Sequence, residues 1–280
     1  PATPPARIYA DPRVIQNAPA RLRQAGFCDI LAKSVSDLDW QCESLLFNGT
    51  YCTLPGALVS ATEASYIDAP EKIGSGDHGA IMGLFKGLLV SGVSMSLAGS
   101  SAPASGGEHL VSHFLDMREK INGRKPDLHG LQVAAGIIVS SVCYRLLLQM
   151  APQRLRANAR EVIDKDLRSI PDVWGNHSPE IEKQFQRKAK RLEAFDTLLP
   201  ENWHALNAIF SKSRLPEHYA SLMRRTGYPL TLSALHLSEA EFLLAVQTCR
   251  TIRDRITVLD LAAHAGILEE AAQKALALLR

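Results

Sequence analysis

The sequence of 280 residues has little of what marks several common protein classes. Aromatic residues make up only 6%, and no stripe of aromatic and basic side chains occurs, which argues against a nucleic-acid interface. The formal net charge is +2, too small to indicate binding to nucleic acid or to an anionic membrane. The five cysteines form no Cys-x-x-Cys pair, and no secretory signal precedes them. We therefore expect a cytoplasmic protein with reduced thiols.

Two long apolar stretches, Ala80–Gly99 and Leu131–Met150, are each long enough to cross a bilayer. Lys86 interrupts the first and Arg145 the second, and both stretches are rich in glycine, serine and alanine. We therefore expect two buried core helices and no membrane span. The small residues of the second stretch would permit close helix packing.

Alternating strand patterns longer than a few residues are absent, whereas apolar residues recur at helical spacings, so we expect an all-α fold of roughly ten helices. A single domain over residues 1–280 is expected, with a soft boundary near Pro152–Pro171. Gly26 is expected to break the chain before a helix over Phe27–Leu46, which would place Asp29 in a first turn. Further helices are expected over Val14–Ala25, Pro55–Ala69, Arg154–Arg168, Glu180–Glu193, Trp203–Ser211, Glu217–Thr226, Glu239–Asp254, Thr257–Ala265 and Leu268–Leu279. Asp77 and the Ser238/Glu241 capping box would start two of the helices.

Three histidines stand near expected helix starts and form a candidate metal site. His109 and His113 are four residues apart, so their side chains would lie on one helix face, and His129 opens the next apolar helix. Paired helical histidines are also common as surface or core residues, so the spacing alone leaves both interpretations open.

Several neighbouring residues allow a functional or a structural interpretation. Glu108 is interpreted as a helix-start acid, because adjacent helical residues point apart. Lys33, one turn after Asp29, would be solvated or ion-paired, or would reach the pocket. The serines of the loop 100–105 could cap the next helix or leave its amides free for a phosphate. A basic run is interpreted as a solvated helix face, because glutamates interleave with it: Lys183, Arg187, Lys188, Lys190 and Arg191.

Four runs of the sequence resemble one family over nearly the whole chain. They are Gln24-Ala-Gly-Phe-Cys-Asp-Ile-Leu-Ala-Lys-Ser-Val-Ser-Asp-Leu-Asp-Trp40, Ser105-Gly-Gly-Glu-His-Leu-Val-Ser-His-Phe-Leu-Asp116, His129-Gly-Leu-Gln-Val133 and Ile252-Arg-Asp-Arg-Ile-Thr-Val-Leu-Asp-Leu-Ala262. They resemble the metal-binding domain of the sn-glycerol-1-phosphate dehydrogenases. That family belongs with the iron-type alcohol dehydrogenases, glycerol dehydrogenases and dehydroquinate synthases.

The resemblance implies a multi-helical bundle of the dehydroquinate synthase-like C-terminal type. It also implies a divalent metal, zinc first and nickel or iron as alternatives, held by Asp29, His109 and His129. His113 would contact the substrate and act in catalysis, and Asp29 would also lie against the substrate. One carboxylate and two imidazoles leave open positions on such a cation for substrate oxygens.

The sequence also departs from the family. Its enzymes carry an N-terminal nucleotide-binding domain, and no Gly-x-Gly-x-x-Gly run occurs here. We expect either a fragment, or a natural chain that lost this domain or receives it from a partner, and NAD(P) would bind only where such a domain is supplied. An exposed apolar face would favour a homo-oligomer. Cys28 stands where the family usually has glycine, and Leu131 stands where His-Gly-Glu is usual, which removes a possible outer partner of the metal site.

The sequence leaves three hypotheses about function. The first is the metal-binding half of an NAD(P)-dependent dehydrogenase for glycerone phosphate and sn-glycerol 1-phosphate, inactive alone in hydride transfer. The second is a stand-alone metal-dependent lyase or isomerase acting on a small phosphorylated substrate. The third is a non-catalytic helical module, which would bind no ion.

Overall fold

The structure is a computed structural model that describes residues 5–155 and 158–280. Every regular element in these two ranges is a helix, so the expected all-α class is confirmed. The α-helices are α1 (Pro12–Gln16), α2 (Ala20–Leu31), α3 (Lys33–Phe47), α4 (Thr53–Ser60), α5 (Ala64–Ile67), α6 (Pro70–Ser75), α7 (His78–Ala98), α8 (Gly107–Ile121), α9 (His129–Gln149), α10 (Ala159–Trp174), α11 (Ser178–Leu192), α12 (Phe195–Phe210), α13 (Pro216–Arg225), α14 (Glu239–Thr248), α15 (Val258–His264) and α16 (Leu268–Leu278). Short 3-10 helices are η1 (Ala102–Ala104), η2 (Pro152–Arg154), η3 (Gly175–His177), η4 (Ser233–Leu235) and η5 (Cys249–Ile252).

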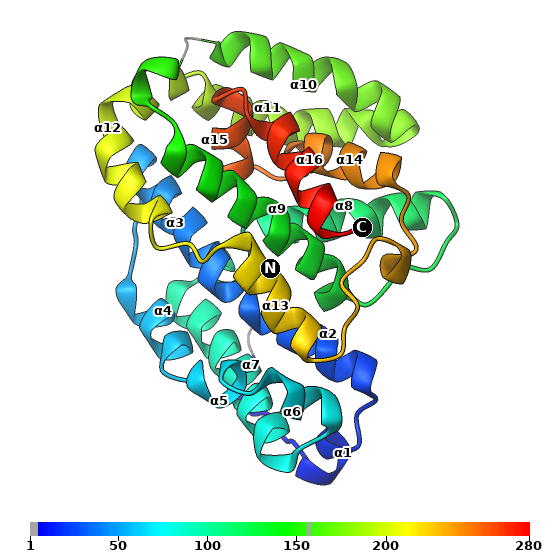
Figure 1. Ribbon diagram of the computed structural model, residues 1–280. Coiled ribbons are helices and arrows are strands. Elements are labelled where there is room, and N and C mark those ends of the chain that lie inside the picture. Colours follow the sequence, from blue (N-terminus) through cyan, green and yellow to red (C-terminus); the bar gives the residue numbers. More distant parts are fainter. Residues whose placement is uncertain (1–4, 156–157) are drawn as a thin grey trace.

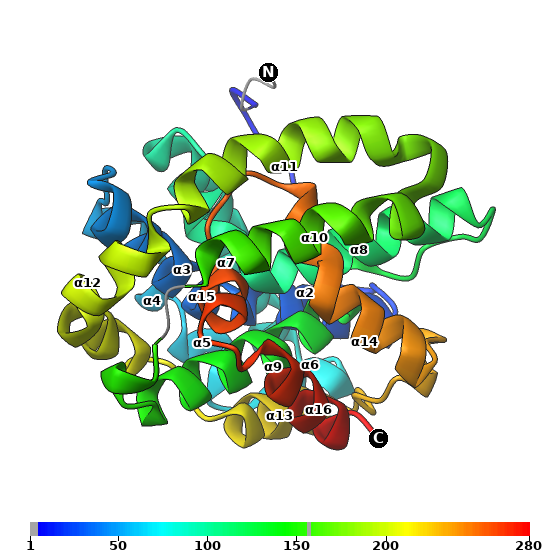
Figure 2. The same cartoon turned by 90° about the horizontal axis from the view of Figure 1, so that it is seen from above.

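Helix α9 is the centre of the molecule, with α2, α8, α13, α15 and α16 packed around it (Figures 1 and 2). Two of its glycines let neighbouring backbones approach closely. A Cβ at Gly130 would lie 2.0 Å from the carbonyl oxygen of Ala25 in α2, and one at Gly136 would lie 2.1 Å from that of Glu108 in α8. Only glycine fits at such contacts, so the small residues of this stretch bring α2 and α8 against α9.

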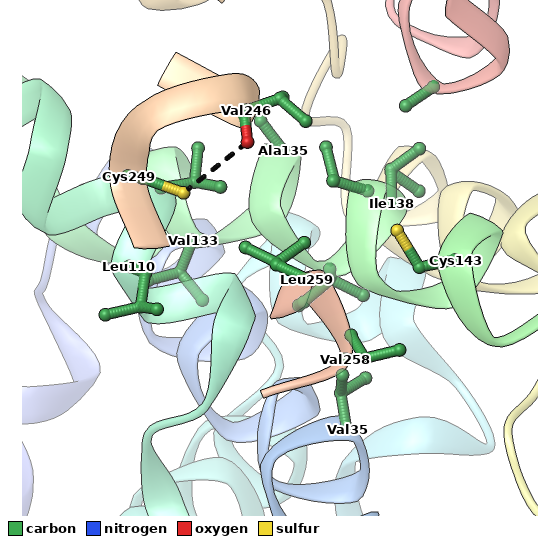
Figure 3. Packing of buried hydrophobic residues seen from close by; sticks show 14 of the residues in the cluster. Val35, Leu110, Val133, Ala135, Ile138, Cys143, Val246, Cys249, Val258 and Leu259 are labelled. Atoms are coloured by element: carbon green, nitrogen blue, oxygen red, sulfur yellow. Dashed lines mark hydrogen bonds between the residues drawn. The ribbon is translucent and has the colours of Figure 1, made fainter. Parts of the chain in front are cut away.

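The core joins the two halves of the sequence around α9. Figure 3 shows Val133, Ala135 and Ile138 among apolar side chains of distant helices, and all of them are buried. The other side chains labelled there are Val35, Leu110, Val246, Cys249, Val258 and Leu259 from other elements and Cys143 from α9 itself. Burial of such side chains stabilises a fold by roughly 1.5–3 kcal/mol each, so this layer fixes the helices that carry the polar clusters described below.

Gly26 lies inside α2, so the expected break at this residue is wrong. A Cβ there would lie 3.3 Å from the Leu88 side chain of α7, which indicates that the glycine serves helix packing. The interruption falls at Ala32 instead, between α2 and α3. Asp29 therefore stands in the last turn of α2 and not in a first turn, and the helix dipole does not explain a carboxylate there.

The two apolar stretches differ in burial. In an 18-residue apolar window, 83% of the α9 residues but only 28% of the α7 residues are buried, although both helices are long and apolar enough to cross a membrane. The expectation of a buried core helix is confirmed for α9 and wrong for α7. Val93 and Leu97 of α7 are more than half exposed, because α7 packs on α2, α4 and α5 with one side only.

Helix ends are partly as expected. Asp77 caps α7 by accepting from the Ala80 amide at 2.9 Å, and Ser238 with Glu241 forms the capping box of α14. Proline and turn residues divide the chain more finely than hydrophobic periodicity does, so the described residues hold sixteen α-helices and not ten. The helix expected over Arg154–Arg168 begins at Ala159, and residues 156–157 lie outside the described part of the chain.

Four buried charged side chains form what we call the buried ion cluster: Asp166, Lys188, Arg250 and Asp260. Lys188 Nζ lies 2.7 Å from Asp260 Oδ1 and donates to the Arg250 carbonyl at 2.9 Å. Arg250 pairs with Asp166. The basic run of α11 is therefore not wholly a solvated face, because Lys188 has no exposed surface.

Candidate functional site

Three side chains from three helices meet at one point, and we call them the histidine–aspartate cluster: Asp29, His109 and His129. His109 Nε2 lies 3.3 Å from Asp29 Oδ1, and His129 Nε2 lies 3.9 Å from the same oxygen. One ligand atom of each lies within 4.8 Å of those of the other two. The close approach of α2 and α8 to α9 at the two glycines makes this convergence possible.

The outer ring nitrogens of both histidines have partners. His109 Nδ1 lies 2.7 Å from Glu108 Oε1, and a carboxylate can only accept there. His129 Nδ1 lies 2.9 Å from Ser112 Oγ, whose own proton goes to Gln132 Oε1 at 2.9 Å. Both Nδ1 atoms therefore donate, so in neutral rings both Nε2 atoms are acceptors near the Asp29 oxygen. When His109 carries a second proton, its Nε2 donates to Asp29 instead. Converging acceptors of this kind suit a positive species, either a proton or a metal cation.

Lys33 neutralises the far side of Asp29. Its Nζ lies 3.2 Å from Asp29 Oδ2 and 3.0 Å from the carbonyl of Ala104, and its side chain is buried. Burial alone would raise the pKa of Asp29, but the charge of Lys33 and the hydrogen bond from His109 hold it well below its usual range. Asp29 is therefore ionised at any ordinary pH, with Oδ1 directed at the histidines. Lys33 is thus ion-paired and also part of the pocket.

His109 and His129 differ in exposure and in the direction of their pKa shifts. Burial lowers the pKa of His109, but hydrogen bonds to Asp29 and Glu108 outweigh it and raise the pKa overall. His129 has 43% of its side chain exposed, and burial together with the charge of His109 lowers its pKa. The cluster is therefore closed on the His109 side and open on the His129 side.

His113 lies beside the cluster without joining it. Its ring centroid is 6.1 Å from that of His109 and 5.6 Å from that of His129. Burial, and then the charges of His109 and His129, lower its pKa to about 4. His113 also forms a second group of possible ligands with Asp116 and His129. A cavity of about 460 Å³ opens beside it and is lined by Asp116, Lys120 and Arg253.

The first amides of α8 are already taken by carboxylates. Gly106 N donates to Glu108 Oε1 at 2.8 Å, and Gly107 N donates to Asp39 Oδ2 at 2.6 Å. These two amides are therefore not available to a phosphate. In the preceding loop, Ser101 Oγ accepts from Arg255 at 3.1 Å, so this serine serves structure.

Asp39 is a buried acid that the sequence pattern did not single out. Its second oxygen accepts from Tyr144 Oη at 2.5 Å and from the Val258 amide at 2.8 Å. Burial, and then the charge of Glu108, raise its pKa to about 7. Asp39 thus caps the starts of both α8 and α15.

Sequence reasoning named Asp29, His109, His113 and His129, and the structure brings all four into one region. It missed Ser112 and Asp39. Glu108 is a helix-start acid as expected, but its carboxylate does not point away from His109, because it bends back to both Gly106 and His109. The two glycines before Glu108 were the available signal, because they leave space for a buried acid at the helix start. The polar residues three positions after His109 and His129 were a second signal, because they lie one helical turn further along: Ser112 and Gln132.

Fold and cluster together define an all-helical domain with a carboxylate and two imidazoles converging at the starts of its central helices. Proteins similar to it in sequence include a glycerol-1-phosphate dehydrogenase [NAD(P)+] of Methanococcoides burtonii, 41% identical over 138 residues, or 49% of this chain and 38% of that protein. The enzyme of the same name from Bacillus licheniformis is 32% identical over 172 residues, or 61% and 42% of the two chains. The one from Pyrococcus furiosus is 40% identical over 140 residues, or 49% and 39%.

These similarities confirm the resemblance to the glycerol-1-phosphate dehydrogenases, but over 49–61% of this chain and not over nearly all of it. The chain spans about two fifths of the length of the curated relatives it matches. The helical fold is consistent with a C-terminal portion of that family. No family model matches the chain.

Proposed function

We propose that this chain is the metal-binding half of an NAD(P)-dependent oxidoreductase that interconverts glycerone phosphate and sn-glycerol 1-phosphate. The observation that carries the proposal is the convergence of Asp29, His109 and His129 on one point. The relatives support the substrate and the cofactor, because their names give glycerol 1-phosphate and NAD(P)+. We also propose that the chain forms one domain, supported by a cluster of buried apolar side chains that runs from Ala25 to Leu279.

The residues present fit a divalent cation. Two neutral imidazole nitrogens and one ionised carboxylate are a donor set that zinc, nickel and ferrous iron accept, with positions left over for a substrate. The outer hydrogen bonds that the two Nδ1 atoms donate to Glu108 and Ser112 favour the tautomer in which both Nε2 atoms can ligate. We propose Asp29, His109 and His129 as the ligands, with zinc as the first choice.

A bound cation would supply a Lewis acid for the oxygen on the carbon that exchanges hydride. The chain's own residues then orient the substrate and handle its proton. Lys33 holds the Asp29 carboxylate by Oδ2, which leaves Oδ1 in place. His113, with a pKa of about 4, is neutral near pH 7, so a ring nitrogen can accept a proton or a hydrogen bond from a substrate hydroxyl.

The nicotinamide would come from a nucleotide-binding domain that meets the open side of the cluster. We propose that domain, or a second copy of the chain, as the partner, and the cytoplasm as the location. The 280 residues alone would hold a cation but transfer no hydride.

Metal content and affinity test the proposal directly. We expect the purified chain to bind about one equivalent of zinc, nickel or ferrous iron per molecule in equilibrium dialysis. D29N and H129N should abolish this binding, whereas H204N, which alters an exposed histidine of α12, should leave it unchanged. Absence of a tightly bound ion in the wild-type chain would contradict the proposal and favour a non-catalytic module. Oxidation of glycerol 1-phosphate by this chain alone with NAD+ would contradict the need for a partner domain.

A further inference from the structure

Glu108 is a buried acid whose position a role in capping does not explain. It has no exposed surface, and its Oε2 atom is buried without a hydrogen-bond partner among the described residues. An acid that only balances the helix dipole does so equally well at the surface, where it avoids the cost of desolvation. The cost must be offset by a contact that needs the carboxylate in this place.

That contact is the one to His109. A single oxygen, Oε1, accepts from the Gly106 amide at 2.8 Å and from His109 Nδ1 at 2.7 Å. The Gly106 bond fixes the carboxylate to the backbone, and the His109 bond then fixes both the ring plane and the site of the ring proton. The opposite ring nitrogen, Nε2, lies 3.3 Å from Asp29 Oδ1, the longer of the two contacts. In the neutral ring the proton therefore stays on Nδ1, and Nε2 carries the free lone pair.

The backbone around Glu108 is shaped to admit the carboxylate. A Cβ at Gly106 would lie 2.9 Å from Glu108 Oε2 and 2.4 Å from Asp39 Oδ2, so only glycine leaves room for both acids. Asp39 in turn holds the Gly107 amide at 2.6 Å, which fixes the first turn of α8 against α3. The hydrogen bonds of Glu108 and Asp39 thus hold the backbone on either side of residue 107 and the ring of His109 in place.

We propose that Glu108 is a positioning residue, which sets the tautomer and orientation of His109 and thereby the cation affinity of the histidine–aspartate cluster. The proposed effect on cation affinity rests on the proposed function, whereas the tautomer of His109 is a property of the metal-free chain.

Two conservative substitutions separate positioning from charge. E108Q removes the charge but keeps an oxygen at the same reach, which can still accept from His109 Nδ1. E108D keeps the charge but is one methylene shorter, so it can approach the Gly106 amide but not the ring. Positioning therefore predicts that glutamine preserves the site better than aspartate, and a role in charge alone predicts the reverse order. E119Q and E119D, further along α8, are the matched controls.

The tautomer is read by long-range ¹⁵N–¹H correlation spectra of the metal-free protein at alkaline pH, and zinc affinity by competition with a chromogenic chelator. We expect His109 protonated on Nδ1 in the wild type and in E108Q, but a shift toward Nε2 protonation in E108D, with about 10–100-fold weaker zinc binding. The two Glu119 variants should match the wild type.

Wild-type His109 protonated on Nε2 would overturn the inference, as would E108D binding zinc as tightly as the wild type or more tightly than E108Q. If the wild type binds no zinc, the proposed function fails, and the tautomers of the two variants still decide the role of Glu108. Far-ultraviolet circular dichroism before each titration identifies any variant that does not fold. Should E108D not fold, a spectrum of E108Q that has lost the Nδ1 proton would by itself overturn the inference.

Discussion

The buried ion cluster and the histidine–aspartate cluster are both built from segments far apart in sequence, but their charges are balanced differently. In the buried ion cluster, two acids meet two bases, and every member is almost fully shielded from solvent. In the histidine–aspartate cluster, acceptor atoms face one another, and His129 has 43% of its side chain exposed. In the first cluster each charge has an opposite charge within the chain, whereas the acceptors of the second face a point that suits a cation and is reached from the exposed side of His129.

The way the charges are balanced distinguishes a structural cluster of polar side chains from a candidate binding site better than burial or residue type does. Both regions contain buried carboxylates with shifted pKa values: burial raises that of Asp166 to about 6, although Arg250 opposes the shift. What distinguishes the candidate site is that its donors point outward, to Glu108 and Ser112, and its acceptors point inward. Four substitutions probe this contrast.

The largest effect is expected in the buried ion cluster. K188M would leave the buried Asp260 with Arg250 Nη1, 3.7 Å away, as its remaining base, and should lower the free energy of unfolding by about 3–5 kcal/mol. Urea denaturation measures the loss, and K190M on the exposed face of α11 is the control. Zinc affinity of the folded K188M protein should equal that of the wild type. A parallel loss of affinity would show that the two clusters are not independent.

The next effect is expected where α8 crosses α9. G136A would place a Cβ 2.1 Å from the Glu108 carbonyl oxygen, so the helices must separate. We expect a loss of about 1–3 kcal/mol in unfolding free energy, and weaker zinc binding because His109 moves away from His129. G92A in α7, where a Cβ meets nothing within 4 Å, is the control. Unchanged zinc affinity in G136A would show that the spacing of the two helices does not set the site.

A smaller effect is expected from the outer partner of His129. S112A removes the acceptor of the His129 Nδ1 proton and should weaken zinc binding by about tenfold, at the low end for an outer-shell partner. Calorimetric titration with zinc measures it. S141A, another buried serine that bonds only within α9, should bind zinc as the wild type does. Equal affinity in S112A would mean that the Ser112 hydroxyl does not orient the ring.

A fourth effect concerns acid stability. The pKa of His113 is about 4 in the folded chain against an ordinary 6.5, so the unfolded chain takes up this proton first as the pH falls. The free energy of unfolding therefore loses this contribution between about pH 6.5 and about pH 4. Asp39, with its raised pKa, acts in the opposite direction in part of this range, so the difference between the wild type and H113N is the quantity to measure. A difference that does not change with pH would contradict a neutral His113.

Sequence reasoning found the fold class and four residues of the candidate region, because helical periodicity and ligand types are local properties. It failed at Gly26 and Lys188, where the decisive fact is what packs against the residue from elsewhere in the chain. Gly26 faces Leu88 of α7, and Lys188 faces Asp260 of α15. No window of neighbouring residues contains either partner.

Glu108 shows the same limit at shorter range. Side chains that follow one another in a helix do point apart, and the expectation was sound for a regular helix. At the first turn, however, the chain before Gly107 is not helical, so a glutamate can turn back over it and meet its neighbour's ring. The sequence shows that glycines precede Glu108, but it does not show which side chain fills the space that they leave.

Asp39 ties together parts of the chain that are made at very different times. Its carboxylate binds the amides of Gly107 and Val258, the second of which is 219 residues further along. During synthesis, the histidines are therefore made long before Val258, the second residue that Asp39 binds. A contact over 219 residues is costly to close, so we expect the ligands to reach their final positions only after Asp39 has bound Val258. Tight ion binding would then report that the two ends of the chain have come together.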